Sequence, residues 1–116
     1  MTDTLPIENQ EPAIENAASE FNLYDFDQTK KAAAILRAMN HKLRRSILSV
    51  IDKTGTTNVT SIYKELNIEQ SVASQHLAIM RRAKIVTASR TGKQILYSVN
   101  HERINHYMNK VKEILS

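Results

Sequence analysis

A mainly α-helical domain with one small β-hairpin is the fold class that the 116-residue sequence predicts. Apolar residues recur at helical spacing over most of the chain after residue 28, which indicates a series of amphipathic helices. Two short segments on either side of Thr91-Gly92-Lys93 instead have the composition of paired strands. The length suits one domain with a single core, and the lack of cysteine excludes disulfides and thiolate metal sites.

The elements are expected in the order helix, helix, short helix, helix, hairpin, helix. Thr29 should cap the first helix, which runs to about Met39, and Asn40 should cap the second, over about 41–53. The later elements are expected over about 59–66, 69–83, 85–90, 94–99 and from about residue 100 onward. Two helices joined by a tight turn at Asn67-Ile68 and followed by a basic hairpin are typical of a winged helix-turn-helix.

Charge is segregated along the chain. Residues 1–27 carry seven acids and no Lys or Arg, a charge of −7, whereas residues 28–116 carry all 16 Lys and Arg against five acids, a charge of +11. We therefore divide the chain into an acidic, partly disordered segment, 1–27, and a winged helix-turn-helix domain, 28–116. The high positive charge of residues 28–116 indicates a polyanionic partner, although a solvated basic surface is the alternative.

The acidic segment itself has two candidate structures. It could be a disordered leader, with a short helix around 13–21. Alternatively it packs as an extra helix beside the first helix through four closely spaced apolar residues, Phe21, Leu23, Tyr24 and Phe26. Because these apolar residues are too dense for a purely disordered segment, we expect order from about residue 19 onward.

The fourth helix has two chemically different faces. Its apolar face should pack inward through Ala73, Leu77 and Met80. Its opposite face carries short polar side chains, an amide and a guanidinium that suit base edges in a major groove: Ser71, Ser74, Gln75, Ala78 and Arg82. At the hairpin tip, Arg90 and Lys93 lie beside Gly92, where two cations would reach phosphates or the minor groove. An ordinary solvated helix face and an ordinary charged turn are the alternatives.

Three stretches of the chain carry further motifs. Residues 38–48 read AMNHKLRRSIL, residues 68–81 read IEQSVASQHLAIMR, and residues 90–99 read RTGKQILYSV. They resemble, in order, the opening pattern A-L-x-H-P-L-R-x-x-I-L, the recognition-helix pattern L-S-Q-S-x-V-S-x-H-L-x-x-L-R and the wing pattern R-x-G-x-x-x-x-Y-x-L. These patterns belong to the ArsR/SmtB family of bacterial winged-helix repressors, and the resemblance covers about residues 30–115.

The resemblance implies a homodimeric repressor that binds double-stranded DNA at an inverted-repeat operator. It also implies that Ser71, Ser74, Gln75 and His76 lie at or near the DNA, because they occupy the S-x-x-S-x-H positions. Together with the cations of the helix face and the hairpin tip, the expected DNA contact residues are Gln70, Ser71, Ser74, Gln75, His76, Arg82, Arg90 and Lys93. For His76, a histidine at the edge of the core and bonded to the backbone is the alternative. Dimerisation is implied through the first and last helices, at Ile35, Ile104, Tyr107, Met108, Val111 and Leu115.

The chain departs from the family pattern at several positions. Lys42 stands where the family often has Pro, and Lys84 replaces a common Gly after the recognition helix. Where the family's last-helix metal site begins with Asp-x-His, this chain has His101-Glu102-Arg103, and arginine cannot ligate a cation. We therefore expect no metal and no cofactor, and a capping or surface role for His101.

Other function classes find little support in the sequence. The four histidines are scattered and form no catalytic constellation, so we expect no enzyme. The main alternative to DNA binding is a winged-helix module that binds an acidic protein partner. No apolar run approaches a membrane span and no secretory signal is visible, so we expect a cytoplasmic protein without a membrane partner.

Overall fold

The computed structural model describes residues 22–116, which form five helices and one hairpin. The helices are α3 (Leu23–Met39), α4 (Lys42–Thr54), α5 (Val59–Leu66), α6 (Gln70–Arg82) and α7 (His101–Leu115). Strands β1 (Val86–Thr91) and β2 (Gln94–Val99) pair between α6 and α7. The predicted mainly helical class with a small hairpin is confirmed in this part of the chain. The helix considered around 13–21 and the disorder expected in the early tail lie outside the described residues.

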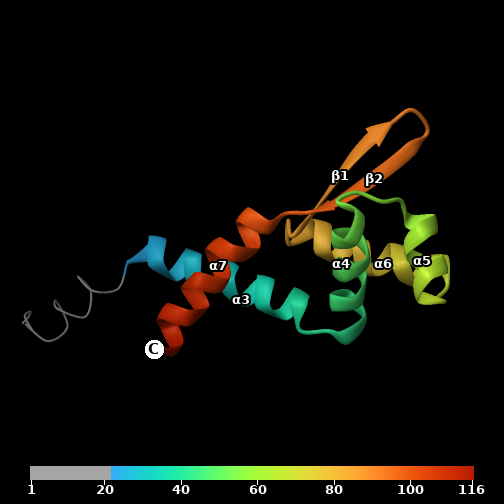
Figure 1. Ribbon diagram of the computed structural model, residues 1–116. Helices are drawn as coiled ribbons and strands as arrows, with labels where there is room; N and C mark the ends of the chain where they lie inside the picture. Colours follow the sequence, from blue (N-terminus) through green and yellow to red (C-terminus); the bar gives the residue numbers. More distant parts are fainter. Residues whose placement is uncertain (1–21) are drawn as a thin grey trace, which may run out of the picture.

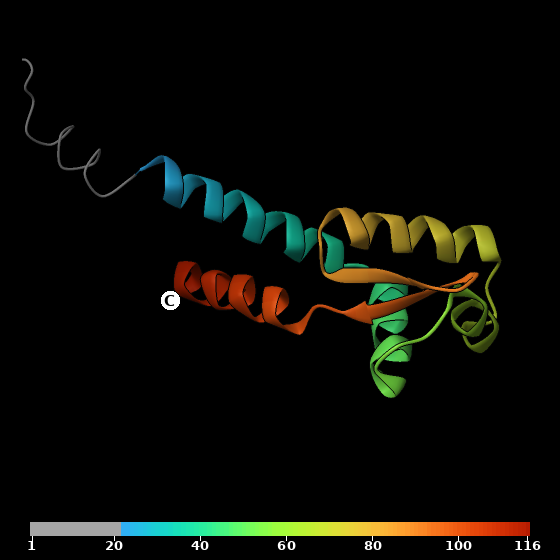
Figure 2. The same ribbon diagram turned by 90° about the horizontal axis from the view of Figure 1, so that it is seen from above.

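The described residues form two parts (Figure 1). Helices α4, α5 and α6 pack together with the hairpin, while α3 and α7 extend from this body side by side (Figure 2). They run in opposite directions, so the start of α3 and the end of α7 lie at the same far end. No helix among residues 22–116 is long and apolar enough to cross a membrane.

The start of the first helix differs from the prediction. Asn22, not Thr29, is the N-cap of α3, and its Oδ1 accepts a hydrogen bond from the backbone N of Asp25 at 2.8 Å. Asp25 also places a carboxylate in the first turn, where the helix dipole favours it. The helix therefore runs through the boundary placed between residues 27 and 28, because a change of charge along the chain does not by itself end a helix.

The apolar residues before that boundary also differ from the expectation. Leu23, Tyr24 and Phe26 form the first turns of α3 itself rather than an extra helix beside it, and all three are exposed. The order expected from about residue 19 is confirmed from residue 22, and Phe21 lies outside the described residues. The first helix is thus longer than the periodicity after Thr29 indicated.

The second helix also begins with a different cap. His41 is the N-cap of α4, and its Nδ1 accepts from the backbone N of Leu43 at 3.2 Å, whereas the expected cap, Asn40, ends α3. A neutral imidazole nitrogen can replace the usual side-chain oxygen as an acceptor, which the preference for Asn, Asp, Ser and Thr does not capture. The later helix starts agree with expectation, and β1 begins at Val86, one residue later than predicted.

The core is built from the three helices of the main body and the start of the hairpin, together with buried residues of α3 and Tyr107 of α7. The predicted inward face of α6 is confirmed, because Ala73, Leu77 and Met80 are fully buried. They pack in one cluster with large side chains from the neighbouring elements: Ile35, Ile47, Ile51, Ile62, Ile85 and Val86. Burying each such large side chain contributes roughly 1.5–3 kcal/mol, so the core holds α6 rigidly on one face.

The hairpin is attached to the body at its base. In its register Val86 lies opposite Val99 and Arg90 opposite Ile95. Beyond the two strands, Thr57 forms a bridge with Tyr97 through two backbone hydrogen bonds, of 3.1 and 2.8 Å. This bridge, which sequence reasoning missed, ties the hairpin to the loop before α5 and leaves its tip projecting (Figure 1).

Candidate nucleic-acid interface

The outward face of α6 is polar and accessible. Its predicted contact residues Gln70, Ser71, Ser74, Gln75 and Arg82 are all exposed, and Ala78 between them is half-buried. Within residues 22–116, none of these five polar side chains has a hydrogen bond or an ion pair to another residue. Their donors and acceptors are therefore available to an external partner, while the opposite face of the same helix is fixed in the core.

A tight turn sets the position of α6 against α5. Asn67 adopts the left-handed conformation with φ 55°, which Asn tolerates better than most residues. The backbone N of Ile68 then bonds to the carbonyl of Tyr63 at 3.0 Å, which closes the end of α5. The turn predicted at Asn67-Ile68 is therefore confirmed, and it places the first turn of α6 at the surface. The N-cap residue Glu69 makes no side-chain capping bond there.

The hairpin tip is cationic. Arg90 and Lys93 are exposed on either side of the turn, where Gly92 has φ 63°. Residues 84–99 contain three cations, Lys84, Arg90 and Lys93, and no acid. No side chain in the described range pairs with Arg90 or Lys93, so both charges are free to meet an anion.

His76 lies apart from the exposed row of α6. It is half-buried between α6 and the start of α4, where the Nη1 atom of Arg44 donates to its Nδ1 at 3.3 Å. Its ring centroid lies 4.7 Å from that of His41. Desolvation by burial, followed by the nearby His41 and Arg44, lowers the pKa of His76 below its usual 6.5. The histidine is at the edge of the core, as the alternative held, but its bonding partner is a side chain rather than the backbone.

Three arginines from three helices surround a hollow of about 310 Å³ beside the end of α6. They are Arg37 of α3, Arg44 of α4 and Arg82 of α6, and no acid is among the lining residues. Arg44 is held in place, because its Nε donates to the carbonyl of Ala38 at 2.6 Å. The DNA contacts predicted from the sequence include Arg82 but not Arg37 or Arg44, since no local spacing connects these two residues with Arg82.

The predicted dimer residues fall into three groups by burial. Ile35 and Tyr107 are buried within the single chain, at 1% and 6% exposure. Ile104, Met108 and Val111 are half-buried against the core, whereas Leu115 is 81% exposed. Further apolar side chains are exposed on the same two helices: Leu23, Tyr24, Phe26, Leu36 and Ile114.

His101 belongs to the start of α7 but does not cap it. Asn100 is the N-cap, and its Oδ1 accepts from the backbone N of Arg103 at 3.1 Å. His101 Nε2 instead donates to Asp52 Oδ1 of α4 at 2.7 Å. Of the two roles expected for His101, capping or surface, the structure therefore shows the surface one. Between residues 22 and 116, no group of three or more His, Cys, Asp or Glu side chains could hold a metal ion.

Comparison with known proteins gives consistent matches. The family profile described as "Bacterial regulatory protein, arsR family" matches residues 41–88. The chain is 32% identical over 85 residues to the HTH-type transcriptional regulator YgaV of Escherichia coli (strain K12), covering 73% of this chain and 86% of that protein. It is 38% identical over 72 residues to the transcriptional repressor PagR of Bacillus anthracis, covering 62% of this chain and 72% of that protein.

Solved structures agree with the sequence matches. The crystal structure of PagR superposes with a TM-score of 0.63 at 31% identity, covering 74% of this chain and 98% of that chain. A homodimeric winged helix-turn-helix DNA-binding domain from Mycobacterium bovis gives a TM-score of 0.68 over 84% of this chain and 90% of that chain. At 18% identity the second match bears on the fold alone, and the fold it shares is the predicted winged helix-turn-helix.

Proposed function

Because the chain belongs to the arsR family of bacterial regulatory proteins, and is thus a DNA-binding transcriptional regulator, we propose that it acts as a dimeric, sequence-specific repressor. The observation that carries the proposal is the exposed, unpaired polar row of α6 on a helix whose other face is fixed in the core. A rigid helix with free donors and acceptors is what direct reading of a major groove requires.

In this proposal, α6 enters the major groove. Gln75 offers both a donor and an acceptor to a base edge, Ser71 and Ser74 add short hydroxyls, and Ala78 leaves room for a thymine methyl. Gln70 lies in the first turn of α6, close to the phosphates that flank the groove. His76 supports DNA binding indirectly in this proposal, because its contacts with Arg44 and His41 hold α6 against the start of α4.

The backbone contacts come from two cationic surfaces in this proposal. Arg90 and Lys93 at the hairpin tip bind phosphates beside the groove, because neither charge has a partner within the described chain. The hollow formed by Arg37, Arg44 and Arg82 provides a second phosphate site at the other end of α6. A site with three guanidinium groups and no carboxylate favours an anion.

Dimerisation is proposed through α3 and α7. The two helices lie side by side beyond the main body and leave exposed apolar side chains, with Leu23 and Leu115 at 80% and 81% exposure (Figure 2). Covering these side chains with a second copy would remove apolar area from water. A two-fold dimer presents two α6 helices related by symmetry, so the proposed operator is an inverted repeat. The repressor role follows the naming of PagR as a transcriptional repressor.

The test is a selection of binding sites from a duplex library with a randomised centre, followed by affinity measurements on the selected site and on random DNA. We expect an enriched inverted repeat. The Gln75→Ala variant should lose roughly 1–3 kcal/mol on the selected site and little on random DNA, because it removes a base contact. Asn109→Ala, an amide removed from the exposed surface of α7, is the matched control and should leave both affinities unchanged.

Two results would contradict the proposal. If the selection enriches no sequence and binding to duplex DNA is weak at every site, the alternative of an acidic protein partner gains support. If Gln75→Ala weakens selected and random DNA equally, α6 does not read bases in the proposed way.

A further inference from the structure

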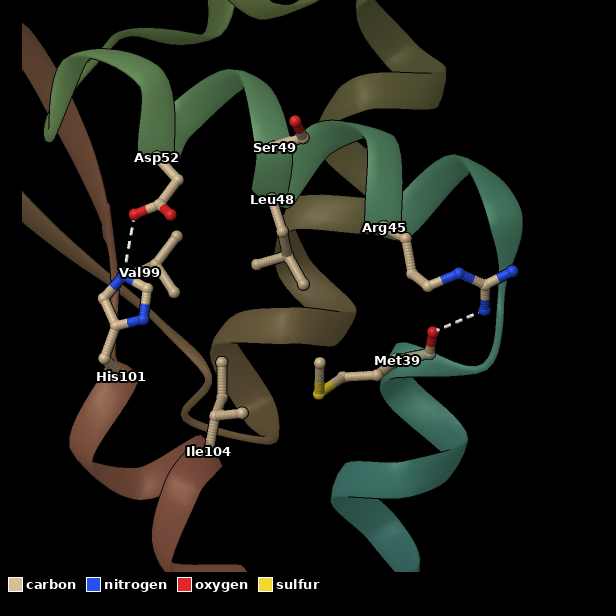
Figure 3. Close-up of a pocket in the computed structure, with 8 residues that line it drawn as sticks. All are labelled: Met39, Arg45, Leu48, Ser49, Asp52, Val99, His101 and Ile104. Atoms are coloured by element: carbon tan, nitrogen blue, oxygen red, sulfur yellow. Dashed lines mark hydrogen bonds and ion pairs between the residues drawn. The ribbon is translucent and has the colours of Figure 1, made fainter. Parts of the chain in front are cut away.

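Four apolar side chains from four elements converge on one hollow of about 380 Å³ (Figure 3). Met39 comes from the end of α3, Leu48 from α4, Val99 from the end of β2 and Ile104 from α7, and they point toward one another. Met39, Val99 and Ile104 are only half-buried, so the hollow opens to solvent. Its volume is at the lower end of the roughly 300–1,000 Å³ of small-molecule pockets, which suits a small ligand.

The rim of the hollow carries one cation, Arg45, that has free hydrogen-bond donors. Arg45 Nη1 donates to the carbonyl of Met39 at 2.9 Å, and the other guanidinium donors have no protein partner within residues 22–116 (Figure 3). The acid on the rim, Asp52, is already paired with His101 at 2.7 Å. A ligand would therefore meet a free cation at one end of an apolar surface.

We propose that this hollow is a binding site for a small organic monocarboxylate with an apolar body. The carboxylate pairs with the free edge of Arg45, while the body packs among Met39, Leu48, Val99 and Ile104. The planar guanidinium fork matches the geometry of a carboxylate. An organic amine fits less well, because Arg45 repels it and His101 already occupies Asp52.

Such a ligand would contact both parts of the molecule. Leu48 and Arg45 belong to α4, which packs in the core with α6, whereas Met39 and Ile104 belong to the α3 and α7 pair. A ligand that binds one arrangement of these parts better than another shifts the balance between them. The binding site stands without the proposed function, and only its coupling to DNA affinity rests on that function.

The test uses 4-phenylbutanoate and its neutral amide as probes on the full chain. Each is titrated while the methyl signal of ¹³C-labelled Met39 is followed by NMR, with calorimetry for the dissociation constant. We expect a saturable shift with the acid and an affinity about tenfold or more weaker with the amide, because a charge-assisted hydrogen bond is lost.

Variants locate the charge that the probe uses. Arg45→Gln should abolish the preference for the acid, and Arg45→Lys should keep much of it, since the positive charge remains. Lys112→Gln removes an exposed cation elsewhere on α7 and is the matched control, so it should keep the full preference. Melting curves for each variant show that the comparison is made on folded protein.

Several results would overturn the proposal. These are the absence of any saturable shift up to millimolar probe, equal affinity for acid and amide, or a preference that survives Arg45→Gln. A Met39 signal that changes with protein concentration and not with probe would show that a second copy fills the hollow instead. The DNA affinity of the same samples, measured before any probe is added, separates this site from the proposed DNA-binding function. If the protein binds DNA but does not bind the probe, only the proposal of this site is overturned.

Discussion

Neutralising the hairpin tip should reduce the salt dependence of DNA binding by a calculable amount. The variants are Arg90→Gln and Lys93→Gln, two exposed side chains without a partner in the described chain. Since neither side chain packs in the core, the substitutions should leave the fold intact. Their effect on affinity should therefore report on phosphate contacts alone.

The magnitude follows from counterion release. Each phosphate contact adds about 0.9 to the slope of log affinity against log salt, so one substitution, which removes two contacts from a dimer, lowers the slope by about 1.8. Between about 50 and 200 mM salt, this makes the loss of affinity about 12-fold smaller than in the unmodified protein. The double variant should show about twice the change in slope, because the two contacts are independent.

Fluorescence anisotropy on the selected operator and on a random duplex, at four or more salt concentrations, measures the slopes. Lys112→Gln, which neutralises an exposed cation on α7, controls for the change in net charge. We expect Arg90→Gln and Lys93→Gln to lower the slope equally on both duplexes. An unchanged slope, or a change in which sequence is preferred without a change in slope, would refute the assignment of the hairpin tip to phosphates.

Four further predictions concern stability and regulation. Because the pKa of His76 in the folded chain lies below the unfolded value of 6.5, stability should fall as pH drops from about 6.5 toward that lower pKa, and chemical denaturation of His76→Gln should show less of this fall. Lys84 has φ 63°, so Lys84→Gly should stabilise the fold by about 0.5–1 kcal/mol in the same assay, whereas Lys84→Ala should not. Zinc, cadmium and arsenite at micromolar concentrations should leave operator affinity unchanged, and a stoichiometric site linked to loss of DNA binding would contradict this. Deleting residues 1–18 removes four acids and should tighten binding to random DNA at low salt without changing Tm, whereas a large drop in Tm would make that segment structural.

Features that depend on neighbouring residues could be predicted from the sequence. The spacing of Ala73, Leu77 and Met80 indicated the buried face of α6, because a helix repeats every 3.6 residues whatever surrounds it. The turn at Asn67 and the hairpin around Gly92 were likewise predictable, since both positions have a positive φ that few residues tolerate. The polar row of α6 followed as the opposite face of the same helix.

Features that join distant parts of the chain required the tertiary structure. The sequence could not decide whether the first helix begins at Asn22 or at Thr29, because both residues are good N-caps. Only the folded chain selects Asn22. The Thr57–Tyr97 bridge and the pairing of His101 with Asp52 join segments with no shared local pattern. 

The arginine hollow beside α6 and the apolar hollow beside Arg45 also required the tertiary structure. Arg37 and Arg82 come together beside α6, and Met39 and Ile104 face one hollow, only because α3 and α7 pack where they do. Sequence periodicity determines which side of each helix is apolar, but it contains no information on the distance between two helices. That distance is set by the packing of side chains from several elements at once, and so only the fold decides which charges and apolar groups share a site.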